Sequence, residues 1–399
     1  MKQGEAMSLL KQLLPLAALL LLSIVPTDSR VVTSVEDCNE FFLQQIPPNI
    51  PGILEGRNIQ DQNRYKVICQ TLRNISRFVT LYDTKNRIPV FSAAEYRGGA
   101  AGKRPKINWM IEPQLENIND NDNMIPADKR ITYNHQAGDI DYYKQTEFDR
   151  GHLFPSLYKS DEVDKRSTFT LTNAVPQRRQ FNNGRWNMME RCVKCILDNY
   201  CINNNDRREG FVVIGAQPSN EIPLNQRINI PSVLWSAFCC YSHSKESWLA
   251  SAHWGENKDD GPNLQTKTLG ELHTELGIEA FPGTQCPNDT SVTELYSEPE
   301  SLCHSKCRQY WNRKKSTSTP PTTTALQIQH LCLLHPTHRS LPAPHLSHHL
   351  EHLPHFPPQF QITVPHLVSQ QLALWVLQPV STAATVQISS TFFKKVSSK

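Results

Sequence analysis

The tetrapeptide Asp149-Arg150-Gly151-His152 contains residue types that could hydrolyse a phosphodiester bond. This hydrolysis requires an activated water, neutralisation of the phosphate charge and stabilisation of the leaving oxygen. A neutral histidine can accept a proton from water near physiological pH, and the planar fork of an arginine can bind phosphate oxygens. The intervening glycine allows a backbone shape that other residues resist. By itself the tetrapeptide is a modest signal, because most Arg-x-His sequences are surface residues.

Neutral amides and a glutamate follow within the next forty or so residues. Asn173 lies in T-N-A-V-P-Q (172–177), Asn182 lies in F-N-N-G-R-W (181–186), and Glu190 follows. Such oxygen ligands suit Mg²⁺, which keeps most of its waters and takes few protein ligands. Asn182 is therefore a candidate metal ligand, and Glu190 a candidate to hold metal-bound waters.

Each of these two residues also has an ordinary structural interpretation. Asn182 stands where a helical pattern begins, so it could cap that helix. Glu190 could lie on a solvated helix face or pair with Arg191 or Lys194.

Short apolar runs predict the strands of the sheet that must position these side chains. Three runs are continuous, as in strands buried on both faces, and a fourth alternates threonine with apolar residues. These predicted strands are 211–216, 233–238, 247–252 and 168–172.

Helical spacing appears next to the candidate metal ligand. Trp186, Met189, Val193 and Ile196 recur three or four residues apart, which predicts a helix of about four turns. A second helix is predicted around 268–276. Together the elements predict an α+β fold with a mixed or antiparallel central sheet and flanking helices.

Ten of the eleven cysteines lie between Cys38 and Cys307. In an oxidising compartment this even set predicts up to five disulfides, whose pairing the sequence does not reveal. The competing interpretation is structural zinc, because Cys192 and Cys195 form a C-x-x-C. Cys332, the eleventh, is expected to be unpaired.

Both ends of the chain differ in composition from the middle. Lysines, an apolar run at 13–25 and then small or polar residues are typical of a signal peptide. That run is shorter than the roughly 20 residues of a membrane-spanning helix. We therefore expect a signal peptide at 1–29, a globular domain at 30–312 and a tail at 313–399. The tail is rich in Ser, Thr and Pro and then in His and Pro, and is expected to be disordered.

These features predict a secreted, disulfide-stabilised protein without stable membrane association. The sequons at Asn74 and Asn288 would allow glycosylation. The net charge of +3 is too small to indicate nucleic-acid binding by itself.

In their order and spacing, D-R-G-H, T-N-x-x-P-Q and N-N-G-x-W-x-x-x-E resemble the DNA/RNA non-specific endonucleases, and in particular a secreted branch of that family. Further similar phrases lie at 81–84, 87–92, 109–115 and 230–237. The resemblance implies an active site of the ββα-metal type.

Matched position by position, the resemblance implies a role for each motif residue. It makes His152 the general base, Arg150 a phosphate contact and Asn182 the direct metal ligand. Asn173 and Glu190 would support them.

Other roles implied by the resemblance are less closely tied to a motif. Asp149 would fix the loop through hydrogen bonds rather than act as a second base. An upstream arginine would contact the phosphate, with Arg97 and Arg104 as candidates. The cofactor would be Mg²⁺, with Mn²⁺ or another divalent cation as alternatives. The substrates would be DNA and RNA, and a homodimer is common in the family.

The sequence therefore predicts a secreted, metal-dependent endonuclease that cleaves DNA and RNA with little sequence preference. One alternative is a catalytically silent nucleic-acid-binding or structural protein on the same scaffold. Another is a phosphodiesterase acting on small nucleotides. The presence of every key motif residue favours the endonuclease.

Overall fold

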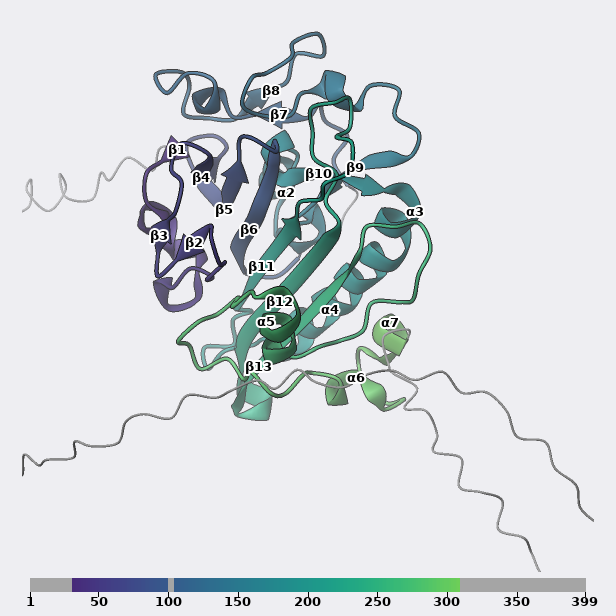
Figure 1. Cartoon of the computed structure of the whole chain (residues 1–399). Coiled ribbons are helices and arrows are strands. Elements are labelled where there is room, and N and C mark those ends of the chain that lie inside the picture. Colours follow the sequence, from purple (N-terminus) through teal and green to yellow (C-terminus); the bar gives the residue numbers. More distant parts are fainter. Residues whose placement is uncertain (1–30, 100–103, 309–399) are drawn as a thin grey trace, which may run out of the picture. The chain divides into compact units, whose positions relative to one another are not determined.

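A seven-stranded antiparallel sheet forms the centre of the protein (Figure 1). The computed structural model describes residues 31–99 and 104–308. Along the sheet the strands follow the order β1 (Val31–Val32), β4 (Tyr65–Thr71), β5 (Ser76–Asp83), β6 (Ile88–Tyr96), β11 (Gly210–Gln217), β12 (Val233–Ser242) and β13 (Ser247–Glu256).

The middle of this sheet is buried on both faces. Val213 of β11 lies opposite Ala93 of β6 and Ala237 of β12, and all three side chains are buried. Continuous apolar runs form such strands because both faces lose contact with water. The predicted strands at 211–216, 233–238 and 247–252 are confirmed as parts of β11, β12 and β13.

The fourth predicted strand, at 168–172, is wrong. Residues Leu171–Asn173 form a 3₁₀ turn instead. The Thr170 and Thr172 hydroxyls hydrogen-bond to each other, and the Asn173 amide binds nearby backbone groups. Local side-chain hydrogen bonds of this kind compete with strand pairing, and alternation of residue types does not reveal them.

Both predicted helices are confirmed. Helix α4 (Asn187–Tyr200) buries Met189, Val193 and Ile196, and α5 (Leu269–Leu276) is capped by Thr268. In Figure 1, α4 lies behind the sheet and α5 lies in front of it. The α+β fold class with a central antiparallel sheet and flanking helices is therefore established.

A separate two-stranded sheet carries the sequence motifs. Strands β9 (Phe148–His152) and β10 (Ala174–Arg178) are antiparallel, with His152 opposite Ala174. Helix α2 (Glu162–Ser167) lies in the connection between them. After β10 the chain enters α3 (Arg179–Phe181), a π-helical segment (Asn182–Trp186) and then α4. Strand β10 and the long helix are therefore joined without a loop.

Short elements complete the described part of the chain. The short strands are β2 (Leu54–Glu55), β3 (Asn58–Ile59), β7 (Met110–Ile111) and β8 (Ile125–Pro126), and the short helices are α6 (Glu294–Ser297) and α7 (His304–Cys307). The 3₁₀ helices besides Leu171–Asn173 are Val35–Phe41, Leu43–Gln45, Pro113–Leu115, Asp139–Tyr142, Ser156–Tyr158 and His243–Lys245.

All ten cysteines of the described region form disulfides, as predicted. The pairs are Cys38–Cys69, Cys192–Cys307, Cys195–Cys303, Cys201–Cys240 and Cys239–Cys286. The zinc interpretation of the C-x-x-C is wrong, because both of its sulfurs are bonded to cysteines at the start and end of α7.

The predicted signal peptide at 1–29, the tail at 313–399 and Cys332 lie outside the described residues, so these assignments stay predictions. Within 31–99 and 104–308, no helix has the length and hydrophobicity needed to cross a bilayer.

The two disulfides between α4 and α7 close nearly the same loop, with sequence separations of 115 and 108 residues. Once one is present, the other restricts only the seven residues by which these separations differ. Replacing either pair by alanine should lower the free energy of unfolding by roughly 2 kcal/mol, and replacing both pairs by roughly 7 kcal/mol. Urea titration measures these losses. A loss of stability in the four-cysteine variant that equals the sum of the two single-pair losses would contradict this coupling.

Candidate active site

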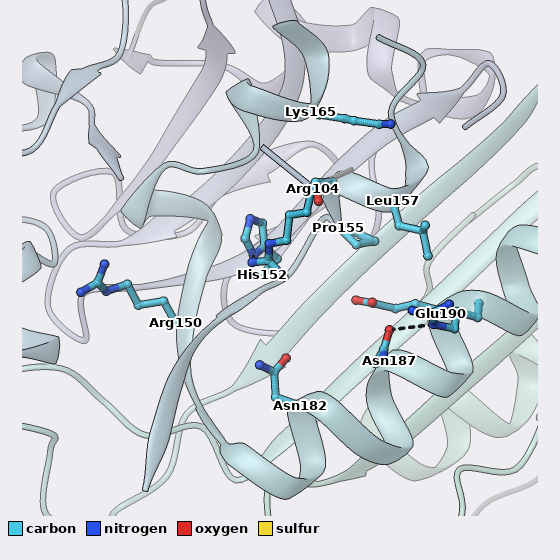
Figure 2. A pocket seen from close by; sticks show the side chains of 11 residues that line it. Arg104, Arg150, His152, Pro155, Leu157, Lys165, Asn182, Asn187 and Glu190 are labelled. Carbon is cyan, nitrogen blue, oxygen red and sulfur yellow. Dashed lines mark hydrogen bonds between the residues drawn. The ribbon is translucent and has the colours of Figure 1, made fainter. Parts of the chain in front are cut away.

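A cavity of about 260 Å³ lies where β9, α2 and the start of α4 meet (Figure 2). Its lining residues are Arg104, Arg150, His152, Pro155, Ser156, Leu157, Lys165, Asn182, Asn187, Glu190 and Arg191. Five of the seven predicted site residues therefore line one cavity, and Arg97 and Asn173 do not.

Gly151 allows β9 and β10 to pack closely. A Cβ atom at this position would lie 2.0 Å from Oε1 of Gln177, a buried side chain of β10. Gly151 is not among the glycines with positive φ. The expectation of an unusual backbone shape is therefore wrong: the glycine is needed because another side chain occupies the space.

His152 is enclosed by aromatic rings at the end of β9. Its ring centroid lies 4.8 Å from that of Trp109 and 4.6 Å from that of Phe169, and the residue is only 7% exposed. Burial, together with the positive charge of Arg104, holds the pKa of His152 well below its ordinary value. His152 is therefore neutral near pH 7.

The contact with Arg104 indicates which ring nitrogen carries the lone pair. Nη2 of Arg104 lies 3.3 Å from Nδ1 of His152, and a guanidinium can only donate. In the neutral ring, Nδ1 therefore accepts and Nε2 bears the proton. Nε2 is buried without a hydrogen-bond partner among the described residues. The unprotonated ring nitrogen of His152 is thus the one that faces Arg104.

Asp149 orients Asn182. Its Oδ2 accepts hydrogen bonds from Nδ2 of Asn182 at 3.0 Å and from Nδ2 of Asn183 at 2.7 Å. Its Oδ1 accepts a hydrogen bond from Nε of Arg179 at 3.2 Å. Because a carboxylate binds the nitrogen of the Asn182 amide, the amide oxygen is directed elsewhere, and Figure 2 shows it on the side of Glu190.

The helical backbone at Asn182 is widened. Asn182 has helical φ and ψ, and its side chain makes no capping hydrogen bond, so the interpretation as a helix cap is wrong. Gly184 departs from helical geometry within the π-helical segment. Such insertions change the phase of a helix and are frequent at functional sites. Here the insertion lies between Asn182 and Glu190, which share the same cavity wall.

Glu190 is a half-buried carboxyl in this wall. Burial raises its pKa to about 8, although the charges of Arg104 and Arg191 oppose the shift. It forms no ion pair with Arg191 or Lys194 within the described part of the chain, and Lys194 instead pairs with Asp198. The ion-pair interpretation of Glu190 is therefore wrong.

Arg150 lies at the edge of the cavity. Its Nη1 pairs with Oδ1 of Asp139 at 2.9 Å, and its guanidinium lies over the rings of Trp109 and Tyr142. In Figure 2 its side chain extends away from Glu190. The ion pair with Asp139 therefore fixes the direction in which the Arg150 side chain extends, at one side of the cavity.

The structure places Asn173 and Arg97 outside the cavity. Asn173 is fully buried, donates to the carbonyls of Phe154 and Thr168 and accepts from the amide of Phe154, each at 3.0 Å. It thus fixes the chain that follows His152. The exposed Arg97 pairs with Glu95. Of the two upstream candidates, only Arg104 reaches His152.

Lys165, Asn187 and Arg191 also line the cavity but belong to none of the sequence motifs. Lys165 lies on a short helix that no periodicity predicts, and the sequence indicates Arg191 only as a possible partner of Glu190. Only the spatial arrangement of α2 and α4 places them in the cavity.

A family model described as DNA/RNA non-specific endonuclease matches residues 55–284, more than half of the chain. The chain belongs to this family. All the cavity residues lie within the matched range.

Curated relatives agree with this assignment. The chain is 30% identical over 210 residues to human endonuclease domain-containing 1 protein and 29% identical over 212 residues to that of Mus musculus. These matches cover 51% of this chain and 39% and 38% of the relatives, so the chain spans about two fifths of their length. The resemblance of the motifs to the branch that carries this name is therefore confirmed.

Two further similarities are more distant. A protein of Nostoc sp. named nuclease is 26% identical over 132 residues, which cover 32% of this chain and 45% of that protein. A chain in the solved structure of the EndoG/EndoGI complex is 17% identical, with a TM-score of 0.40 over 56% of this chain and 94% of that chain.

The environment of His152 predicts an unusual titration. A histidine with the ordinary pKa of about 6.5 would be mostly protonated at pH 5.5, whereas His152 should stay neutral because its folded-state pKa is lowered. NMR of the His152 ring between pH 8 and 5.5, assigned with a His152→Gln variant, should show no titration. The unfolded chain binds this proton more readily, so His152 should lower stability as the pH falls below about 6.5. A midpoint near 6.5 would contradict the inferred environment.

Proposed function

We propose that this chain is a secreted, divalent-metal-dependent endonuclease that hydrolyses DNA and RNA with little sequence preference. The observation that carries the proposal is the convergence in one cavity of a neutral histidine, the oriented Asn182 and a carboxyl. Membership of a family whose description names both nucleic acids supports it.

The cavity residues fit a hydrated divalent cation. Asn182 and Glu190 would hold Mg²⁺, or Mn²⁺ as the alternative, through the Asn182 amide oxygen and through waters bound to Glu190. No cluster of three His, Cys, Asp or Glu side chains with metal-binding geometry occurs in the described residues. A site with few protein ligands is the kind that Mg²⁺ occupies. When bound, the cation supplies charge neutralisation at the phosphate and at the leaving oxygen.

The protein residues would carry out the proton transfer. With substrate bound, the guanidinium of Arg104 would turn from Nδ1 of His152 to the phosphate, where it stabilises negative charge and leaves the lone pair of Nδ1 free. Nδ1 then accepts a proton from a water as that water's oxygen forms its bond to phosphorus and the bond to the leaving oxygen breaks. Arg150 adds charge from the other side. The protonated ring then lies beside Arg104, which favours release of its proton to solvent and regenerates the neutral base.

Secretion, glycosylation and the role of Asn173 are supported by other observations. Five disulfides are typical of proteins that mature in an oxidising compartment, which supports secretion. Both sequon asparagines are exposed, which supports glycosylation. A role for Asn173 in positioning His152, in place of direct catalysis, follows from its backbone hydrogen bonds. Homodimerisation stays a prediction from the family resemblance.

His152→Ala should lower the rate of plasmid and RNA cleavage by about 10²–10⁴-fold, because it removes the general base. Wild-type cleavage should need a divalent ion and stop with EDTA. Circular dichroism checks that the variant is folded. A folded wild type that binds DNA but cuts nothing with Mg²⁺ or Mn²⁺ would favour the silent scaffold. Cleavage confined to small phosphodiesters would favour the nucleotide phosphodiesterase.

Asp149→Ala should weaken metal binding, because the Asn182 amide loses the partner that orients it. Loss of such an outer contact typically costs about 10–100-fold in metal affinity or activity. The Mg²⁺ concentration for half-maximal cleavage should rise accordingly, and excess Mg²⁺ should restore much of the rate. Asp139→Ala is the matched control: it frees Arg150 but leaves Asn182 held. Similar Mg²⁺ requirements for the two variants would contradict the role of Asp149.

A further inference from the structure

The direction of the Arg150 side chain depends on one short element, the 3₁₀ helix Asp139–Tyr142. This helix supplies Oδ1 of Asp139, which lies 2.9 Å from Nη1 of Arg150. It also supplies the ring of Tyr142, whose centroid lies 5.5 Å from the guanidinium carbon of Arg150. Trp109 adds a further ring at 5.8 Å. A shift of the 3₁₀ helix would therefore move a carboxylate and a ring beside the Arg150 guanidinium together.

The buried carboxylate of Asp141 holds this helix in place. Its Oδ2 accepts a hydrogen bond from the backbone amide of Gly138 at 2.8 Å, at the start of the helix. Its Oδ1 accepts hydrogen bonds from Nε of Arg227 at 2.9 Å and from Nδ2 of Asn225 at 3.3 Å. The Asp141 side chain is fully buried, so both of its oxygens are used within the protein.

Arg227, the cationic partner of Asp141, comes from a distant part of the sequence. It lies in the connection between β11 and β12, and its Nη2 donates to the carbonyl oxygen of Tyr133 at 2.6 Å. The carbonyl oxygen of Arg227 accepts a hydrogen bond at 3.3 Å from Nη1 of Arg87, which directly precedes β6. Arg227 therefore joins the Asp139–Tyr142 helix to a loop that is itself tied to the central sheet.

The planar fork of an arginine fixes an orientation, because its donors lie in one plane. One donor of Arg227 binds the Asp141 carboxylate and another binds a carbonyl oxygen, so a shift of the helix would break charge-assisted hydrogen bonds. Without Arg227, Asp141 would be a buried charge that has lost its cation, which is unfavourable. The helix would then shift to bring this carboxylate toward water, and Asp139 and Tyr142 would move with it.

We propose that Arg227, acting through Asp141, is a positioning residue for Arg150 and for the substrate phosphate that Arg150 contacts. This inference rests on the proposed nuclease function and deepens it. Arg227 lies outside the cavity lining. It acts by keeping the Asp139 carboxylate and the Tyr142 ring beside the Arg150 guanidinium, so that the charge of Arg150 stays at one side of the cavity.

Arg227→Met should lower kcat/KM for a single-stranded DNA oligonucleotide by about tenfold, because a hydrogen bond to a charged group contributes on that scale. Arg150→Met should cause a similar loss. The variant with both substitutions should cleave no more slowly than Arg150→Met alone, since Arg227 acts through Arg150. Losses that multiply in the double variant would overturn the positioning role.

Arg64→Met is the matched control. Arg64 forms a two-bond ion pair with the buried carboxylate of Asp83 at the end of β5, with distances of 2.9 and 2.7 Å. The control therefore removes a comparable ion pair from a different element and should leave kcat/KM unchanged. A loss in Arg64→Met equal to that in Arg227→Met would show a general effect of destabilisation and overturn the proposal.

NMR of the Arg150 side chain gives a readout that needs neither substrate nor metal. The Nε–H resonance of Arg150, assigned with Arg150→Met, should shift in Arg227→Met and stay in place in Arg64→Met. An unchanged resonance in Arg227→Met would overturn the proposal. If the wild type neither binds nor cleaves the oligonucleotide, the proposed function fails while this resonance still decides the positioning role.

A second substitution of Arg227 maintains the test if Arg227→Met does not fold by circular dichroism. Arg227→Lys keeps a positive charge beside Asp141 but lacks the planar fork that also reaches the carbonyl of Tyr133. It should shift the Arg150 resonance and lower kcat/KM in the same direction as Arg227→Met, by a smaller amount. A folded Arg227→Lys variant with wild-type resonance and wild-type kcat/KM would overturn the role of the fork.

Discussion

The geometry of the site depends on the carboxylate of Asp149. It accepts hydrogen bonds from Asn182 and Asn183 at the start of the helical run and from Arg179 before it. Because Asp149 lies on β9 and the other three lie beyond β10, these bonds tie the hairpin to the helix. They also direct the Asn182 oxygen away from the hairpin. Without this carboxylate, the Asn182 amide would lose the contacts that fix its orientation relative to His152.

The second determinant is the electrostatic character of the cavity. Aromatic walls and Arg104 keep His152 neutral, and burial gives Glu190 a raised pKa of about 8. A cation bound beside Glu190 would favour the ionised form of this carboxyl, and an anion would be favourable beside the arginines of the cavity. In the proposed mechanism a metal ion and a phosphate would therefore favour each other's binding.

Disulfides stabilise helix α4, which carries Glu190 and Arg191. Three disulfides involve cysteines of α4 or the residue that follows it: two link it to α7 and one links Cys201 to β12. The helix also buries an apolar face against the core. A rigid α4 keeps Glu190 and Arg191 at constant positions relative to the hairpin, which a preorganised charged site requires.

Local sequence patterns determined the strands at 211–216, 233–238 and 247–252 and both long helices, because each depends on periodic burial within one segment. The motif spacing likewise singled out His152, Arg150, Asn182 and Glu190, which line one cavity. An even number of cysteines indicated disulfides.

Only the tertiary structure decided the rest. It selected Arg104 over Arg97, moved Asn173 out of the cavity and brought in Lys165 and Arg191. It also paired the cysteines and showed that Gly151 is required by the side chain of Gln177. These outcomes depend on contacts between residues far apart in the chain. Such contacts arise when elements pack against one another, and a pattern within a single segment carries no record of them.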